Sequence, residues 1–166
     1  MQSGNAMLAL HAAMLAAMLL IAGAAGHASE TETTMSEALD FKTLEKATSP
    51  NRWLVAPASA LGKSEADAAA PTWGKPPADV FTALVSVVEA EGAYSGVAKD
   101  NAAMTIRFVA TVPVFGFKDD VDAVILPADG GSTIAIYSRS RVGYSDFGVN
   151  KKRVDRIVAA LDSKLN

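Results

Sequence analysis

The sequence predicts an α+β fold in which an antiparallel sheet of at least three strands is covered on one face by two helices. The first observation is the alternation of apolar and polar residues in MTIRFVATV, residues 104–112, which is typical of a half-buried strand. The second is the turn sequence PADGGS, residues 127–132, between two further strand-like runs, which indicates a hairpin. The third is a pair of segments with apolar residues at helical spacing, one before and one after the strands.

The chain begins with an uncharged segment that predicts export. Residues 1–28 contain no Asp, Glu, Lys or Arg, and residues 6–25 form an apolar run of about the length that spans a bilayer. The small residues of GAAGHASE favour cleavage after Ala28, whereas the lack of basic residues in MQSGN leaves a retained anchor as the alternative. We therefore expect residues 1–28 to be a signal peptide or membrane anchor. The protein is expected in the periplasm, or on the inner membrane facing the periplasm.

A polar, acidic spacer at residues 29–40 is expected to lead into one globular domain at residues 41–166. The block FKTLEKATSPNRWLVAP supplies apolar anchors before and after a break at Pro50. These anchors are Phe41, Leu44, Trp53, Leu54 and Val55. Residues 56–77 are rich in Ala and Pro and predict an extended segment lying over the domain.

Two helices are predicted from their apolar stripes. The first opens near Asp79 and ends near Glu91, and the second follows Asn150, which we expect to be its N-cap. The stripes consist of Val80, Phe81, Leu84, Val87 and Val88 in the first helix and of Val154, Ile157, Val158 and Leu161 in the second.

The second and third strands, residues 120–126 and 133–141, are expected to pair as a hairpin. If Ile125 faces Ile134, one face of the hairpin is apolar, and the other places Asp122 opposite Tyr137 and Asp120 opposite Arg139. A slip of two residues keeps these faces, because side chains alternate with period two.

The composition excludes several kinds of site. The chain has no Cys, and both of its histidines, His11 and His27, lie in the leader. Disulfides, thiolate nucleophiles and thiolate metal sites are therefore excluded, and a His-based triad or His-ligated zinc is excluded once the leader is removed.

Charge is uneven along the chain. Residues 139–166 hold seven Lys or Arg against three Asp or Glu, and residues 29–138 hold eight against fifteen. An acidic body with a basic C-terminal segment lacks the broad basic face of nucleic-acid binders. It fits a local anion site or an internal match of charges.

The stretch SRSRVGYSDFGVNKKRV, residues 138–154, gathers basic side chains where the last strand meets the last helix. Three consecutive basic residues, 151–153, would occupy the first turn of that helix, where the helix dipole favours acidic residues. Free N–H groups at the helix start, together with Arg141, predict an anion site. The anion is an internal one, Asp146, which we favour, or a phosphate or carboxylate of a ligand. The predicted ligand-binding residues are Asp120, Asp122, Arg139, Arg141, Tyr144, Asp146, Asn150 and Lys151.

The acidic run FKDDVD raises the possibility of a calcium or magnesium site. Asp119, Asp120 and Asp122 lie within four residues, but the run lacks the Gly and the terminal Glu of an EF-hand loop. We favour a solvated strand edge paired with Arg139, and we expect neither a metal nor another cofactor. Serine–lysine catalysis is disfavoured because the strand serines are expected to face the core.

The segments FKDDVDAVI and IAIYSRSRVGYSDFGVNKKRVDRIVAAL resemble the uncharacterised proteins grouped as the domain of unknown function 1499 family. Its pattern of two aspartates and S-R-S-R-x-G-x-x-D-x-G-x-N-x-x-R is specific, and FKTLEKATSPNRWLVAP is similar to the family's N-terminal Pro-Asn block. The resemblance covers residues 41–161 and implies an exported or membrane-associated, commonly bacterial protein with no assigned activity. Many members carry Cys after the Pro-Asn pair where this chain has Arg52, so a thiol-dependent function cannot apply here.

Three functions remain open from the sequence. The leading one is a non-catalytic envelope domain that binds an anionic small molecule, a lipid headgroup or an envelope protein near the membrane surface. We expect this protein to bind no nucleic acid and to contact the membrane itself only through its N-terminal segment. The second is a hydrolase using Asp119 or Asp120 as acid or base, with Arg139 and Arg141 stabilising negative charge. The third is a structural envelope protein. A cleft beside Arg141 and Asp146 would favour binding or catalysis, whereas a filled corner with paired charges would favour the structural role.

Overall fold

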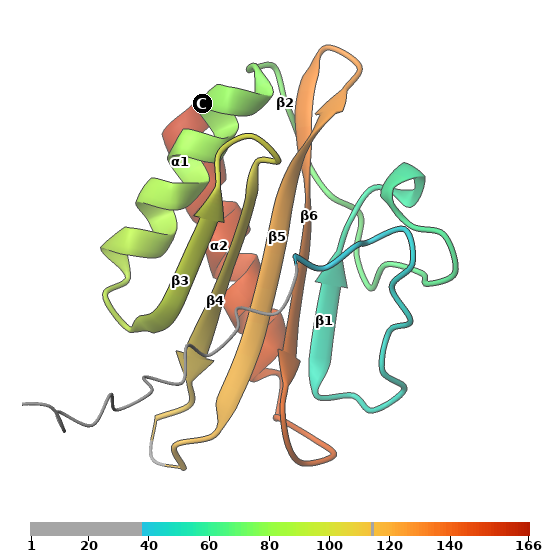
Figure 1. Cartoon of the computed structure of the whole chain (residues 1–166), viewed down its shortest axis with the longest axis vertical. Coiled ribbons are helices and arrows are strands. Elements are labelled where there is room, and N and C mark those ends of the chain that lie inside the picture. The colour runs from blue at the N-terminus through green and yellow to red at the C-terminus, as the bar shows by residue number, and fades with distance from the viewer. Residues whose placement is uncertain (1–37, 114) are drawn as a thin grey trace, which may run out of the picture. The chain divides into compact units, whose positions relative to one another are not determined.

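The described part of the chain, residues 38–113 and 115–166 of the computed structural model, forms a six-stranded sheet with two helices on one side (Figure 1). The predicted α+β fold is confirmed. The expected leader, residues 1–28, and most of the expected spacer lie outside the described residues. Neither helix in the described ranges is long and apolar enough to cross a membrane.

The sheet has the strand order β1-β6-β5-β4-β3, and β2 pairs with β6 off this path. The strands are β1 (Arg52–Val55), β2 (Thr72–Trp73), β3 (Tyr94–Asp100), β4 (Thr105–Thr111), β5 (Lys118–Ala128) and β6 (Gly131–Ser140). The three predicted strands correspond to β4, β5 and β6, although β5 begins two residues before the expected start. All strand pairs are antiparallel.

The predicted hairpin register is confirmed. Ile125 pairs with Ile134, Asp122 with Tyr137 and Asp120 with Arg139. The turn contains Gly130 at φ 77°, a conformation that glycine adopts without steric cost. Odd-numbered side chains of β5 consequently face the helices, and even-numbered ones face the opposite side of the sheet.

Helices α1 (Pro77–Ala90) and α2 (Val149–Leu165) cover the first face with the predicted apolar stripes. The prediction that Asn150 caps the last helix is wrong. Helix α2 begins at Val149, Gly148 occupies the N-cap position, and Asn150 is a buried residue of the first turn. The carboxylate of Asp146 accepts a hydrogen bond from the backbone N–H of Asn150. The side chain that caps the first turn is therefore that of Asp146 rather than that of Asn150.

A second apolar cluster lies on the opposite face, where the segment before β1 packs on the sheet. Its buried members are Phe41, Leu44, Leu54, Ala56, Ala60, Ala135 and Tyr137. Among the described residues, the members of both apolar clusters lie between 39 and 165. The segment 56–77 is not purely extended, because it contains a short 3₁₀ turn, Ala58–Ala60, and strand β2.

Candidate functional site

A buried polar network fixes the corner between β6 and α2. The Arg153 guanidinium donates to the Asp119 carboxylate at 2.7 Å, to the Ser138 hydroxyl at 2.9 Å and to the Asn150 side-chain oxygen at 2.8 Å. Asp119 is 0% exposed, and Arg153 is also buried. Sequence reasoning placed Arg153 in an anion site and Asp119 on a strand edge, and it missed this pair. The one available signal was the helical spacing of Arg153 with Ile157, which sets it on the sheet-facing side of α2.

The carboxylate of Asp146 is held at the start of α2 by three N–H groups. The backbone N–H of Gly148 donates to it at 3.0 Å, and the backbone and side-chain nitrogens of Asn150 each donate at 2.7 Å. The Asn150 amide also donates to the backbone oxygen of Asn51 and to the hydroxyl of Ser140, both at 3.0 Å. Asp146 therefore takes the place of the internal anion, next to the partial positive charge of the helix N-terminus.

On the opposite face of the sheet, the carboxylate of Asp122 joins two arginines. Arg107 on β4 donates to one oxygen at 2.7 Å, and Arg139 on β6 donates to the other at 2.8 Å. Asp122 is 3% exposed, and Arg139 also lies over the ring of Tyr137. This confirms the expected approach of Arg139 to a carboxylate on its own face. The trio ties three neighbouring strands together.

Asp120 forms a separate ion pair with Arg141. Two nitrogens of the exposed Arg141 guanidinium donate to the Asp120 carboxylate, the shortest contact being 2.7 Å. The hydrogen bonds to Asp120, and the attraction of its charge, raise the pKa of Arg141 above its usual value. A surface pair of this kind contributes little to stability.

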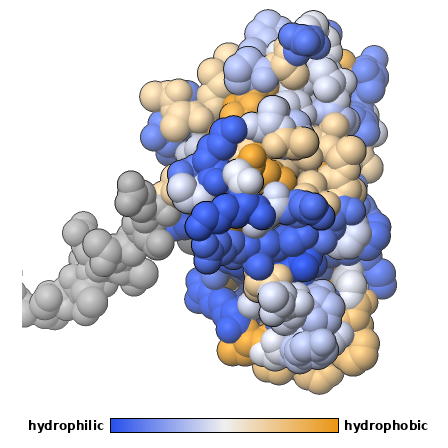
Figure 2. All heavy atoms as spheres, turned by 90° about the vertical axis from the view of Figure 1, so that its right-hand side faces the viewer, coloured by the Kyte–Doolittle hydropathy of each residue, from blue (hydrophilic) through white to orange (hydrophobic). Residues whose placement is uncertain are grey.

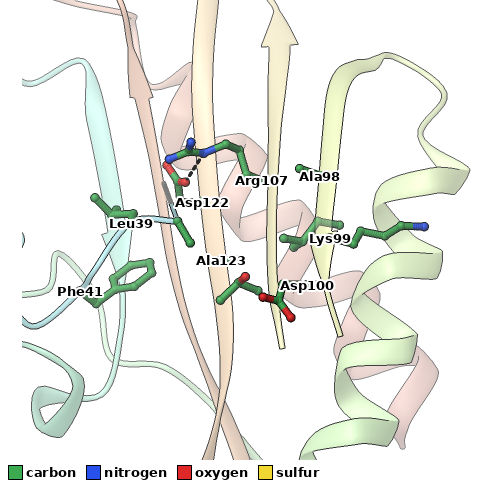
Figure 3. A pocket seen from close by; sticks show the side chains of 11 residues that line it. Leu39, Phe41, Ala98, Lys99, Asp100, Arg107, Asp122 and Ala123 are labelled. Atoms are coloured by element: carbon green, nitrogen blue, oxygen red, sulfur yellow. Dashed lines mark hydrogen bonds and ion pairs between the residues drawn. The ribbon is translucent and has the colours of Figure 1, made fainter. Parts of the chain in front are cut away.

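A shallow pocket of about 240 Å³ lies between the segment before β1 and strands β3–β5 (Figure 3). Leu39 and Phe41 form one side of this pocket, and Arg107 reaches to Asp122 on the other. Both oxygens of Asp122 accept hydrogen bonds from arginines, so the partners of this carboxylate in the pocket are other side chains of the protein. Asp100, which also lines the pocket, accepts hydrogen bonds from the backbone of Ala102 and Ala103.

Asp67 forms a further ion-pair cluster beside β1. Burial alone would raise the pKa of its carboxyl, but hydrogen bonds from Lys46, from the Leu54 backbone N–H and from Arg52 outweigh burial and hold the pKa below its usual value. A depressed carboxyl pKa stabilises the fold at pH values above the unfolded pKa of about 3.9, and this contribution is lost as the pH falls through the folded pKa.

We therefore expect Asp67→Asn to lower the free energy of unfolding by about 1 kcal/mol at neutral pH and by less in acid, because the stabilisation by the ionised carboxyl declines as the pH falls below the unfolded pKa. Urea unfolding of both proteins at pH 7 and at about pH 3 measures the difference. Glu45→Gln, at an exposed ion pair with Lys63, is the control and should change little at either pH. An equal loss for Asp67→Asn at the two pH values would contradict the assignment.

The end of the sheet next to the β6–α2 corner carries exposed apolar side chains. The loop from β4 to β5 and the loop from β6 to α2 both lie at this end, the lower end in Figure 1. We call their exposed apolar residues the apolar tip: Phe115, Phe117, Val142, Tyr144 and Phe147. From the side, apolar atoms reach the surface both above and below a hydrophilic band around the middle of the domain (Figure 2). Sequence reasoning included only Tyr144 of these five.

A cleft of about 350 Å³ opens between the two loops. Its lining is mainly apolar and includes Val112, Phe117, Val142 and Phe147, with Asp146 as its charged member. The sequence had predicted a polar anion site at this corner. The structure has an apolar cleft at this corner, beside a carboxylate whose oxygens are already hydrogen-bonded.

The predicted site residues thus fall into separate groups. Asp122 and Arg139 belong to the trio with Arg107, Asp120 pairs with Arg141, and Asp146 binds Asn150, whereas Tyr144 is exposed in the tip. Lys151 pairs with Asp155 along the helix and lies over the ring of Trp53. Residues 38–113 and 115–166 contain no group of three or more Asp, Glu, His or Cys side chains placed to hold a metal ion.

Comparison with known proteins identifies a family and includes a distant likeness to a solved structure. The crystal structure of Ara h 8.0201 has 17% sequence identity and a TM-score of 0.44, and the match covers 58% of this chain and 93% of that one. No curated protein matches the chain significantly. The model of a family described as "Protein of unknown function (DUF1499)" matches residues 30–161, which is most of the sequence. The chain therefore belongs to the DUF1499 family, as the resemblance of its S-R-S-R segment implied.

Proposed function

We propose that the protein is a non-catalytic binding domain of the cell envelope, and that its binding surface is the end of the sheet formed by the apolar tip and the cleft. The observation that carries this proposal is the gathering of five large, exposed apolar side chains on two adjoining loops around a cleft of about 350 Å³. Exposed apolar groups of this kind are typical of interaction sites, since they lower stability and solubility without a partner.

The geometry gives the hydrolase alternative little support. Asp119 is sealed under α2 and paired with Arg153, whereas Asp120 lies on the opposite face and is bound by Arg141. Two carboxylates on opposite sides of a sheet cannot act together on one substrate. Asp119 is also fully buried, so a substrate at the protein surface could not come within the hydrogen-bonding distance that a general acid needs.

The structural alternative explains the buried charges but leaves the apolar tip unexplained. The contacts of Asp119, Arg153, Asn150 and Asp146 fix the corner between strand and helix. They do not require Phe147 or Phe115 to stand in solvent. A filled corner and an open apolar cleft therefore lie next to each other, and the cleft favours a binding function.

Two exposed lysines close in sequence to cleft-lining residues favour a partner that carries negative charge. Lys118 lies at the start of β5, and Lys152 lies in the first turn of α2, and both are exposed. The side chain of Lys152 has no ion-pair partner among the described residues, and Lys118 donates to the hydroxyl of Thr111. The one carboxylate that lines the cleft, Asp146, already accepts three hydrogen bonds.

An anionic apolar dye tests this proposal. Anilinonaphthalene sulfonate is expected to bind the folded chain that begins at Ser29, and binding should weaken at least about 5-fold in the double variant Phe117→Ser/Phe147→Asn, which removes two cleft-lining rings. Asparagine suits position 147 because it tolerates the positive φ of that residue. Near-ultraviolet circular dichroism should show that both proteins keep their packing.

The matched control is Val97→Ser, since Val97 is an exposed apolar residue on β3, away from the tip. It should bind the dye as the wild type does. Equal dye binding by the wild type and the Phe117→Ser/Phe147→Asn variant would show that the cleft is not the binding surface.

A further inference from the structure

Resting on the proposed binding surface, we infer that the partner of the apolar tip is an anionic lipid bilayer, with the rings entering the interfacial layer and the lysines contacting headgroups. The three most exposed rings protrude from the loops. Phe147 is 90% exposed, Tyr144 76% and Phe115 71%. Rings that line a site for a small ligand would be largely covered by their own cleft, whereas rings that enter a bilayer interface must stand clear of the protein surface.

The two loops are tied to each other, so the tip is one surface. The backbone N–H of Arg141 donates to the carbonyl of Lys118 at 3.0 Å, which joins the start of the β6–α2 loop to the end of the β4–β5 loop. Within the β4–β5 loop, the Val112 N–H donates to the Phe117 carbonyl at 2.8 Å, and the rings of Phe115 and Phe117 are stacked. Aromatic residues held together in this way can enter an interface without first being ordered.

Phe147 adopts a backbone conformation that costs stability. Its φ is 53°, in the left-handed region that bulky side chains avoid and that asparagine or glycine adopts more easily. The ring does not recover this cost by packing, because it stands almost fully in solvent. A strained residue with an exposed ring is the pattern of a functional side chain rather than of a packing one.

The charges around the tip fit an anionic surface. Lys118 and Lys152, close in sequence to tip residues, have no carboxylate partner among the described residues, whereas Arg141 is paired with Asp120 and Lys151 with Asp155. The carboxylate beside the tip, Asp146, is enclosed by N–H groups. The body of the protein is acidic, with eight basic against fifteen acidic residues between 29 and 138, and the segment 139–166 is basic. An anionic bilayer would repel the body and attract this end, which sets a single orientation with the tip toward the lipid.

The chemistry of the binding surface favours lipid over a folded protein partner. Interfacial Tyr and Phe with flanking Lys is the combination that membrane interfaces select, because the ring partitions at headgroup level and the ammonium group meets lipid phosphates. The sequence also carries an apolar run of about bilayer length at residues 6–25, so we expect the chain to meet a membrane during its synthesis.

Vesicle flotation with the chain that begins at Ser29 tests the inference without the apolar run. We expect binding to vesicles of phosphatidylcholine with phosphatidylglycerol and much weaker binding to pure phosphatidylcholine, at about 0.1 M salt. Phe115→Ser/Phe147→Asn should weaken binding at least about 10-fold through lost apolar contact. Lys151→Gln/Lys152→Gln should weaken it by up to about 30-fold at low salt and less at high salt.

Val97→Ser, which leaves the tip intact, should bind the anionic vesicles as the wild type does. A Tyr144→Trp variant should show fluorescence quenching by brominated lipid, which reports entry of the tip into the bilayer. Absence of binding to anionic vesicles, with tip-dependent dye binding retained, would overturn the bilayer partner and leave the proposed binding surface standing. Dimers that dissociate in the Phe115→Ser/Phe147→Asn variant would also overturn it, since a second copy would then cover the tip. Loss of both vesicle binding and tip-dependent dye binding would remove the proposed function as well.

Discussion

Replacing Arg153 by methionine lowers the free energy of unfolding of this domain by about 3 to 5 kcal/mol. The substitution leaves the Asp119 carboxylate, which is fully buried, without its guanidinium partner. One oxygen of this carboxylate, Oδ1, already has no hydrogen-bond partner among the described residues. A buried carboxylate without a counter-charge either stays ionised at a high desolvation cost or takes up a proton, and both outcomes favour the unfolded chain.

Urea unfolding at neutral pH measures this effect, and two further variants define its cause. Asp119→Leu combined with Arg153→Met should recover most of the lost stability, because both charges leave together and apolar groups of similar volume fill the space. Arg156→Met, on the next turn of the same helix, removes an exposed ion pair with Glu91 and should cost less than about 1 kcal/mol. A loss for Arg153→Met no larger than for Arg156→Met would show that the buried pair is not what stabilises the corner.

The Asp146→Asn variant is expected to lose about 1 to 3 kcal/mol of stability. The carboxylate accepts hydrogen bonds from three N–H groups of Gly148 and Asn150, and a neutral amide offers only one acceptor oxygen. Its NH₂ group would face an N–H donor, so at least one of these N–H groups would lose its partner. The favourable interaction between a negative charge and the start of α2 would be lost too.

Thermal unfolding with and without phosphate measures this loss and separates the two kinds of anion considered for the corner. Asp155→Asn, at an exposed carboxylate of the same helix, is the control and should change stability by only a few tenths of a kcal/mol. Phosphate should leave the wild-type midpoint unchanged, because Asp146 already fills the anion position. A midpoint that rises with phosphate in the wild type would instead indicate that the start of α2 takes an external anion.

The elements that sequence reasoning found share a clear periodicity. The alternation in β4, the hairpin turn between β5 and β6, and the apolar stripes of α1 and α2 all follow from local patterns. Strand β3 was missed because Gly96, at φ 58°, and a break in register between Ser95 and Ala98 interrupt its alternation. Strands β1 and β2 are too short to show a period, and their pairing with β6 depends on tertiary contacts.

For the candidate site, the hairpin register sufficed to place Asp122 and Arg139 on one face. It could not show how deeply each charge is buried, because burial depends on where α2 crosses the sheet. Asp119 was expected on a solvated strand edge, but β5 begins at Lys118, so period two turns Asp119 toward the helices. The apolar tip has no periodic signal either, since it arises only where two loops far apart in the sequence come together.

The arginine partners on both sides of β5 also restrict how this strand can pair with its neighbours. Asp119 has a buried arginine partner beneath the sheet, and Asp122 has two partners above it. A slip by one residue would carry Asp120 and Asp122 into the apolar layer and expose Val121. A slip by two would preserve the faces but separate Asp119 from Arg153, leaving both charges unmatched in the interior. Ionic residues that add little net stability can in this way make the alternative registers far less stable, so that the chain folds with a single strand alignment.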